Sequence, residues 1–224
     1  MPIRFVIASL ALGAAAPTIA QETYGSIFGG YSDLSDADFS GTIGGSNQNV
    51  ATDFDSGYNL GIAIGRTLPQ WSGNGYALRA EIELSYSDDD VDSVDFSGNG
   101  AGAEANAAGD ITSTRLFANL IADFETQSAI TPYVGFGLGI DFVDHDIVDG
   151  AANNVTITGS DEAFAAQAIL GASYAVNDTI SLFTDLRYVR SFDVSSTRTS
   201  PGGTARVSDD LSRVNVNFGL RYKF

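Results

Sequence analysis

Residues 213–224 read RVNVNFGLRYKF, and every second position is apolar or aromatic. The positions between them carry Arg, Asn, Gly and Lys, so one face of the segment is apolar and the other is mostly polar. A period of two residues is typical of a β-strand, because successive side chains point to opposite faces of a sheet. This segment therefore predicts a strand with two faces of opposite polarity.

The same period recurs in six other segments: 57–66, 76–86, 115–124, 132–142, 164–174 and 180–189. An eighth segment, 23–31, is also β-like, but Tyr24 and Phe28 compete with Ile27 and Tyr31 for its apolar face. The alanine-rich stretch 163–172 could form a helix by propensity alone. The strict period of its neighbours favours a strand there as well.

The polar faces of these segments carry charges of both signs. By parity they are Arg79, Glu81, Glu83, Arg115, Asp123, Asp141, Asp185, Arg187, Arg213, Arg221 and Lys223. Soluble sheets usually protect their edges with lysine, but Lys223 is the only lysine in the chain. The pattern therefore favours a polar interior over a soluble β-sandwich, which is the alternative fold.

Aromatic residues flank the apolar faces at both ends. One set is Tyr76, Phe124, Tyr174, Tyr222 and Phe224, and the other is Tyr58, Tyr86, Phe142, Phe164 and Tyr188. Two aromatic girdles around an aliphatic band are typical of transmembrane β-barrels.

The connections between the segments alternate in length. The long ones are 32–56, 87–112, 143–162 and 190–212, and the short ones are 67–75, 125–131 and 175–178. Transmembrane barrels have long extracellular loops and short periplasmic turns, and only closure pairs every backbone group within the membrane. We therefore predict an all-β fold, an eight-stranded antiparallel up-and-down transmembrane β-barrel over residues 21–224, with both termini in the periplasm.

Residues 1–20 have the order of a signal peptide: Arg4, then an apolar run, then small residues ending at Ala20. A membrane-anchoring helix is the alternative. The chain has 11 basic and 28 acidic residues, a formal net charge of −17 and no cysteine. The negative charge argues against nucleic acid as a partner, and the absence of cysteine excludes disulfides and thiolate metal sites.

Several short motifs resemble the small opacity-type outer membrane β-barrel proteins, a family with a porin-like barrel. They are residues 132–139 (PYVGFGLG), Asn119 with Asp123 and Phe124, and residues 185–188 (DLRY). Leu220, Tyr222 and Phe224 resemble the terminal signal that the barrel-assembly machinery recognises. The resemblance implies a location in the outer membrane of a Gram-negative cell and assembly by that machinery. It implies no activity, since relatives include structural anchors, adhesins and small enzymes.

The lumen charges include six cations and five anions, so we expect a packed ion-pair network in an interior just wide enough for side chains. A narrow path for ions through the same groups is the alternative. Gly135, Gly137 and Gly139 recur at period two inside a strand, so they do not match a nucleotide-binding loop. We expect these inner-face glycines to make room for bulky neighbours.

The first three long connections are acidic and contain no lysine or arginine. Asp88, Asp90 and Asp92 have the spacing that begins a calcium loop, but the required Gly and closing Glu are missing. We expect at most weak, diffuse binding of divalent cations and no dedicated metal site. His145, the only histidine, has no recognisable catalytic partner, so a hydrolase is a remote alternative.

Together these features predict a non-enzymatic outer membrane protein without a cofactor. We expect it to contribute to envelope integrity or to surface interaction such as adhesion through four long, mostly acidic loops. The expected partners are outer membrane lipid, the barrel-assembly machinery during biogenesis, and a surface ligand on a host or neighbouring cell. A narrow porin-like channel for ions or small solutes is the alternative function.

Overall fold

The structure is a computed structural model that describes the backbone of residues 22–35, 37–43, 46–54, 56–97, 103–104, 107–149, 156–200 and 203–224. Within these ranges it describes the side chains of residues 22–35, 56–90, 110–144, 159–195, 197, 204 and 206–224. The predicted signal peptide, residues 1–20, lies outside the described residues.

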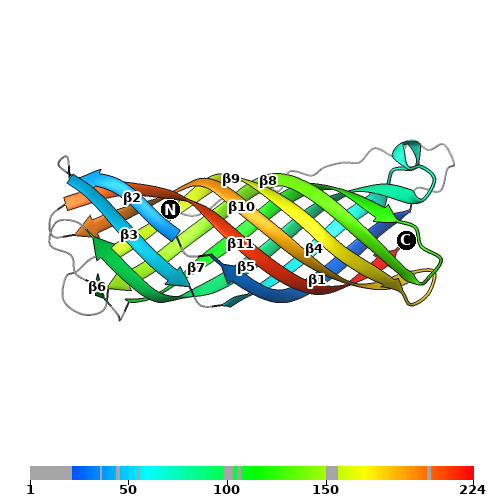
Figure 1. The fold of residues 1–224 in the computed structure, drawn as a ribbon, viewed down its shortest axis with the longest axis horizontal. Helices are drawn as coiled ribbons and strands as arrows, with labels where there is room; N and C mark the ends of the chain where they lie inside the picture. The colour runs from blue at the N-terminus through cyan, green and yellow to red at the C-terminus, as the bar shows by residue number, and fades with distance from the viewer. Residues whose placement is uncertain are drawn as a thin grey trace.

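Eight long strands within the described ranges form the barrel. They are β1 (Thr23–Leu34), β4 (Gly57–Thr67), β5 (Tyr76–Ser97), β7 (Ala107–Phe124), β8 (Ile130–Asp149), β9 (Thr156–Ala175), β10 (Ile180–Ser200) and β11 (Gly203–Lys223). Each strand pairs antiparallel with the next in this order, and β1 also pairs with β11, so the sheet closes on itself (Figure 1). The predicted eight-stranded antiparallel barrel is confirmed.

Shorter elements occupy the connections. The hairpin of β2 (Ala37–Ile43) and β3 (Ser46–Phe54) follows β1, and β3 pairs with the far end of β5. The two-residue strand β6 (Ala103–Glu104) also pairs with β5, and the 3-10 helix η1 (Pro69–Trp71) lies in the turn between β4 and β5. Among the described residues, no helix is long and apolar enough to cross a membrane.

The structure settles the parity of β1. Tyr24 and Phe28 point into the barrel and are 3% and 6% exposed, whereas Ile27 and Tyr31 point outward. The two inward rings lie opposite Gly65 and Gly61 of β4. Because those glycines have no side chain, the bulky rings of Tyr24 and Phe28 fit inside the barrel.

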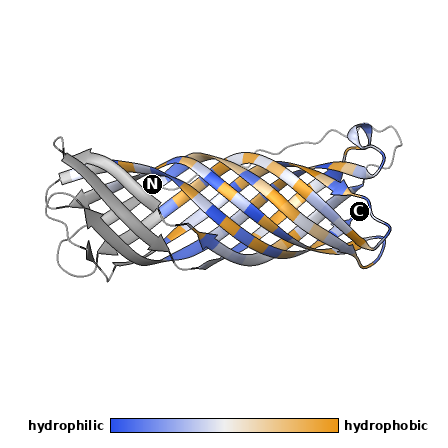
Figure 2. Ribbon diagram, in the orientation of Figure 1, coloured by the Kyte–Doolittle hydropathy of each residue, from blue (hydrophilic) through white to orange (hydrophobic). Residues whose placement is uncertain are grey.

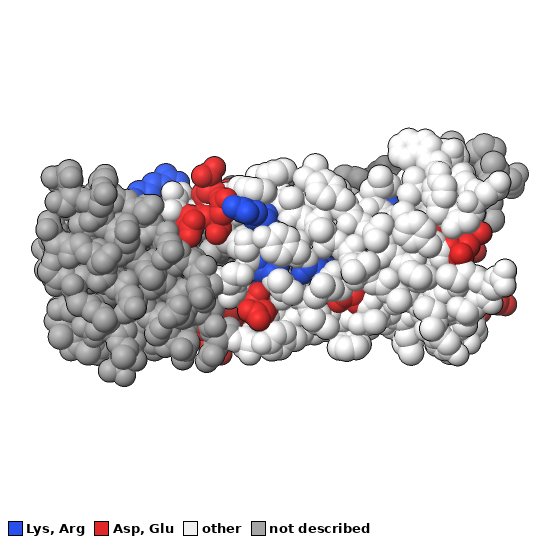
Figure 3. Space-filling view, viewed as in Figure 1, with Lys and Arg blue, Asp and Glu red and all other residues white. Residues whose placement is uncertain are grey.

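The barrel wall has an apolar outer surface bounded by aromatic rings. All ten aromatic residues of the two predicted girdles are exposed. Hydrophobic and hydrophilic residues alternate along the strands (Figure 2), and the surface over the middle of the barrel is mainly uncharged (Figure 3). This surface suits contact with lipid hydrocarbon.

The strands continue far into the ranges that we predicted as long loops. β5 extends to Ser97, β7 begins at Ala107, β8 extends to Asp149, and only residues 201–202 separate β10 from β11. The prediction of four long loops is therefore wrong for much of these ranges. We call the parts of the strands beyond the girdle of Tyr58, Tyr86, Phe142, Phe164 and Tyr188 the outer extension.

The outer extension reverses the polarity of the barrel wall. Next to the girdle its inward side chains are polar, such as Ser87 and Asp89, both 0% exposed. Farther out, the described inward side chains are apolar and at most 3% exposed; we call them the apolar collar: Leu34, Ile111, Val143, Val194, Val207 and Leu211. Its outward side chains include Asp33, Asp90, Asp110, Asp144 and Glu162, all exposed. An apolar inside with a charged outside is the pattern of a protein in water. We infer that the hydrocarbon region ends at the aromatic girdle.

Cysteine labelling can test this boundary, because the natural chain has no cysteine. Leu138 and Asp144 both point outward from β8, below and above Phe142. A membrane-impermeant maleimide should label an Asp144→Cys variant almost completely in lipid vesicles and a Leu138→Cys variant hardly at all, since the thiolate forms in water. Equal labelling of the two variants would contradict the boundary.

Candidate functional site: the lumen ion-pair network

The structure places most of the predicted lumen charges deep inside the barrel. Nine of the eleven residues are at most 8% exposed: Arg79, Glu81, Glu83, Arg115, Asp141, Asp185, Arg187, Arg213 and Arg221. The side chain of Asp123 is 18% exposed and pairs with Arg79. Lys223 lies at the end of the barrel, where its 38% exposed side chain pairs with Glu22.

Arg79 organises the part of the lumen nearest the short turns. Its Nε lies 2.8 Å from Asp123 Oδ2, and its Nη1 lies 3.2 Å from Glu81 Oε2. Nη1 also donates a hydrogen bond to the Tyr24 hydroxyl, which in turn donates to Glu81. Arg221 lies over the Tyr24 ring, 4.9 Å from its centroid, so the ring face stabilises this buried cation.

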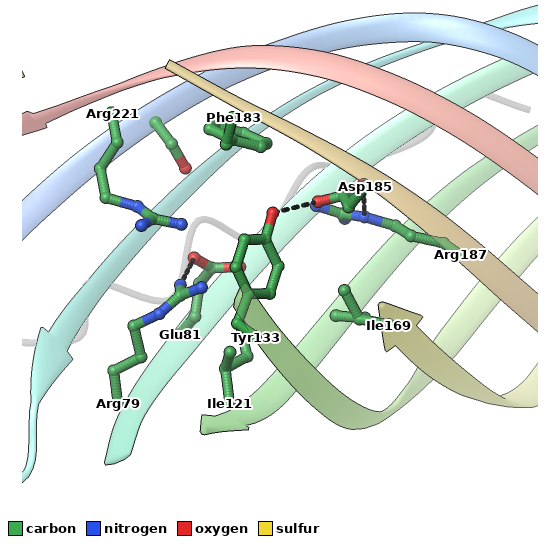
Figure 4. Close-up of a pocket in the computed structure, with 10 residues that line it drawn as sticks. Arg79, Glu81, Ile121, Tyr133, Ile169, Phe183, Asp185, Arg187 and Arg221 are labelled. Atoms are coloured by element: carbon green, nitrogen blue, oxygen red, sulfur yellow. Dashed lines mark hydrogen bonds and ion pairs between the residues drawn. The ribbon is translucent and has the colours of Figure 1, made fainter. Parts of the chain in front are cut away.

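Arg187 organises the centre of the lumen (Figure 4). Its Nη1 lies 2.5 Å from Glu83 Oε2, while Nε and Nη2 donate to the two oxygens of Asp185 at 2.9 and 3.1 Å. The Tyr133 hydroxyl points across the lumen and donates to Asp185 Oδ2 at 3.0 Å. The planar guanidinium thus makes paired, charge-assisted hydrogen bonds with Asp185 on its own strand and an ion pair with Glu83 on β5.

Neutral amides connect these two groups of charges. Asn119 donates to Glu83 at 2.8 Å and to Glu81 at 3.3 Å, and Gln167 donates to the Asn119 carbonyl at 2.8 Å. Asn217 extends the network from Asp185, donating to its Oδ1 at 3.0 Å. The sequence prediction of the network names only charged residues, although each of these amides occupies a polar-face position of its strand.

A third group of charges lies just below the apolar collar. Arg213 forms an ion pair with Asp89 at 2.6 Å, and Ser191 donates to Asp141 Oδ2 at 2.6 Å. Asp89 lies within the connection 87–112 that is predicted as an acidic loop; that prediction is wrong here, because β5 continues through Asp89 and the residue is 0% exposed. Its odd number matches Arg79, Glu81 and Glu83 on the inner face, so parity alone could have identified it.

Glycines on the inner face lie opposite aromatic rings. The cross-strand pairs are Tyr24 with Gly65, Phe28 with Gly61, Phe117 with Gly139, Tyr133 with Gly171, and Phe183 with Gly219. An added Cβ at any of these glycines would collide with the opposite ring. The expectation that inner-face glycines make room for bulky neighbours is confirmed at Gly139, and an added Cβ at Gly135 or Gly137 would likewise collide with Ile121 or Asn119.

Side chains pack closely in the described part of the lumen. Phe28, Ile121, Tyr133, Ile169 and Phe183 form a buried apolar cluster beside the ion pairs. The cavity between this cluster and the charged groups around Arg79 and Arg187 measures about 10 Å³. That is about the space one water molecule needs, so it is too small for a solute.

The candidate cation ligands lie on the outer surface. Asp88 and Asp90 belong to β5, and the hydroxyls of Tyr58 and Tyr86 donate to Asp88 at 3.2 and 3.4 Å. The side chain of Asp92 is outside the described set. Among the described residues, no three acidic, histidine or cysteine side chains are grouped so that they could hold a metal ion.

The only histidine lies on a strand rather than in a loop. His145 is part of β8, and its backbone pairs with Ile111 of β7. Its side chain is outside the described set, so the structure does not test the hydrolase alternative at this residue.

A bulge in β10 is held by an exposed carboxylate above the girdle. Asp193 has a φ of 55°, and its backbone N–H donates to Asp210 Oδ1 at 2.9 Å. Arg190 binds the other oxygen of Asp210 at 2.8 Å. The backbone hydrogen bond and the guanidinium both favour the ionised carboxylate and lower the pKa of Asp210.

Comparison with known proteins shows what kind of barrel this is. The chain is 30% identical to the outer membrane protein PagN of Salmonella typhimurium strain LT2 over 126 residues, which span 53% of each chain, about half of that relative's length. The structure resembles OmpT, an outer membrane protease of Escherichia coli, with a TM-score of 0.57, 10% identity and coverage of 92% of this chain and 99% of OmpT. It also resembles OprG of Pseudomonas aeruginosa, with a TM-score of 0.53, 17% identity and coverage of 90% and 97%.

At these identities the two structural likenesses show the fold and carry no information about activity. Residues 5–224 match the family described as "Outer membrane protein beta-barrel domain". The chain therefore belongs to the outer membrane protein β-barrel domain family.

Proposed function

We propose that this protein is a non-enzymatic outer membrane barrel with a closed lumen, and that it contributes to envelope integrity or to adhesion through its outer extension. The main support is the side-chain packing in the described part of the lumen. Buried ion pairs, amides and aromatic rings leave a cavity of about 10 Å³ around Arg79 and Arg187, and the apolar collar lies above them. The lumen carboxylates bind guanidinium and amide groups, an arrangement suited to stabilising the wall.

The same proposal includes export by the signal peptide, periplasmic termini and assembly by the barrel-assembly machinery. Leu220 and Tyr222 lie on the outward face of β11, and Phe224 directly follows this strand; the three are 36%, 47% and 74% exposed. β11 pairs with β1 where the barrel closes. A signal at this seam would remain accessible until the first and last strands join, which supports its role in assembly.

The outer extension is the surface offered to a partner. Its described outward residues on β5, β7, β8 and β9 include Asp90, Asp110, Asp144 and Glu162. Electrostatic complementarity favours a partner with a basic surface and increases its association rate. Contact with a host or neighbouring cell through this surface is therefore the form of adhesion that we propose.

Single-channel recording of the refolded barrel in a planar lipid bilayer tests the closed lumen. We expect no discrete current steps from the natural protein, because no continuous water path crosses the filled interior. Heat-modified mobility on a gel would verify that the inserted protein is folded. Reproducible steps that change in size in Arg79→Ala or Glu81→Gln variants would contradict the proposal and favour the porin-like channel.

A further inference from the structure

Arg115 has an unusual environment among the lumen arginines. It is 0% exposed, and its Nη2 donates to Asn59 at 3.2 Å and to Ser87 at 3.0 Å. Unlike Arg187, it has no carboxylate within 4.0 Å in the described part of the chain. Its Nε and Nη1 have no acceptor among the protein atoms described. Burying such donors without partners is costly.

The groups around Arg115 include unpartnered acceptors as well as donors. Asp141 lies directly opposite Arg115 across the β7–β8 pair, and its Oδ1 has no donor among the described protein atoms. Asp89 Oδ1 likewise has no donor, and Arg213 Nε has no acceptor, among the described protein atoms. We call Arg115, Asp141, Arg213 and Asp89 the polar layer.

Cross-strand pairing brings the two arginines of the polar layer together. Arg115 binds the hydroxyl of Ser87, and Arg213 binds the hydroxyl of Ser113 at 3.2 Å. Ser87 and Ser113 are directly opposite each other on β5 and β7, and both are 0% exposed. Directly opposed residues have Cβ atoms about 4.5–5.5 Å apart. The unpartnered donors and acceptors therefore lie in one small region of the lumen.

The polar layer lies between apolar groups. Beyond it along β7 and β8, the next inward residues are collar members: Ile111 follows Ser113, and Val143 follows Asp141. On the side facing away from the collar, Phe117, Ala165 and Val189 form a buried cluster. These apolar groups limit access from the outside and surround the layer with low polarity, which makes the unpartnered groups more costly.

The charges of the polar layer distinguish between two possible ligands, a halide ion and a water molecule. Two guanidinium groups and two carboxylates make the layer formally neutral. A halide would accept hydrogen bonds from the arginines, but the unpartnered carboxylate oxygens of Asp89 and Asp141 would repel it. A water molecule donates and accepts, and buried waters typically make about three hydrogen bonds to otherwise unsatisfied groups. We propose that ordered water occupies the polar layer, bridging Arg115 to Asp141 and sealed from the exterior by the apolar collar.

This inference deepens the proposed closed lumen and rests on it only for the seal. A conducting barrel would overturn the closure, while internal water could still be detected at Arg115. A dry Arg115 would overturn the water site, while the barrel could still be closed. The two proposals can therefore fail separately.

Solid-state NMR of the full barrel in lipid bilayers, with ¹⁵N-labelled arginine, tests the proposal. Magnetisation transferred from water should reach Arg115 Nε and Nη early and strongly. It should reach the backbone N–H groups of the strand arginines several-fold more slowly, because these groups pair with neighbouring strands. An Arg115→Met variant assigns the signal by its loss.

Two results would overturn the proposal. One is an Arg115 side-chain signal that builds up as slowly as the backbone signals of the strand arginines. The other is an Arg115 shift that follows the bromide concentration, which would identify a halide as the ligand. An Asp141→Asn variant should alter the Arg115 water transfer and leave that of the exposed Arg190 unchanged. If this variant does not fold, the comparison within the natural protein still decides.

Discussion

Replacing Arg187 with methionine should lower the free energy of unfolding by about 3–5 kcal/mol. The guanidinium of Arg187 neutralises Glu83 and Asp185, which are both buried. Methionine fills a similar volume but leaves two carboxylates without a cation in a low-dielectric interior. Urea unfolding of the refolded barrel in lipid vesicles, followed by gel mobility, measures the change.

Arg190 on the same strand provides a matched control. It pairs with Asp210 at 2.8 Å, but its side chain is 46% exposed. An Arg190→Met variant should therefore lose much less stability than Arg187→Met, because exposed ion pairs contribute little. A Glu83→Gln change should partly rescue Arg187→Met, because it removes one of the uncompensated charges. Equal losses at positions 187 and 190 would contradict the buried network.

Residue parity predicted which charges face the lumen but could not predict their partners. Glu83 and Arg187 both follow the polar period of their strands, so their inward direction was visible in the sequence. Their ion pair joins β5 to β10, strands that do not pair in the sheet. That contact depends on the tilt and stagger of the closed barrel, which a local period does not contain.

The outer extension was missed because the apolar phase changes at the girdle. In β8 the apolar outward positions run through even numbers to Phe142, and the next apolar residue, Val143, is odd and buried. In β11 the apolar outward positions begin at Val214, whereas Leu211 and Val207 face inward. The outward apolar period of the strands ends at the girdle, where their surroundings change from lipid to water. The chain nevertheless continues as a strand.

The amides of the network were missed for a different reason. Polar positions of the strands hold Asn119, Gln167 and Asn217. These side chains are neutral, so they carry no charge whose sign would indicate a partner. Their role becomes clear only when the carboxylates of Glu83 and Asp185 are within reach. Buried carboxylates accept several hydrogen bonds, so a lumen rich in acids also requires amide donors.

The pairing of glycines with rings leads to the second large effect. A Gly61→Ala change should lower the free energy of unfolding by about 1–3 kcal/mol, the usual cost of overpacking a filled interior. The added Cβ would collide with ring atoms of Phe28. Phe28 has little freedom to move, because it lies against Phe183, with ring centroids 6.5 Å apart, and under the Arg187 guanidinium. The same urea titration measures this loss.

Two further variants separate this collision from other effects of alanine. Gly25 is in β1, and a Cβ there would make only ordinary contacts, 3.4 Å from Phe224 and 3.9 Å from Ala63. Gly25→Ala should therefore be close to neutral, or slightly stabilising through the lower entropy of the unfolded chain. In a Phe28→Ala background, adding Gly61→Ala should cost almost nothing, because the colliding ring is gone. An undiminished cost in that background would place the origin of the effect in the backbone rather than in the ring.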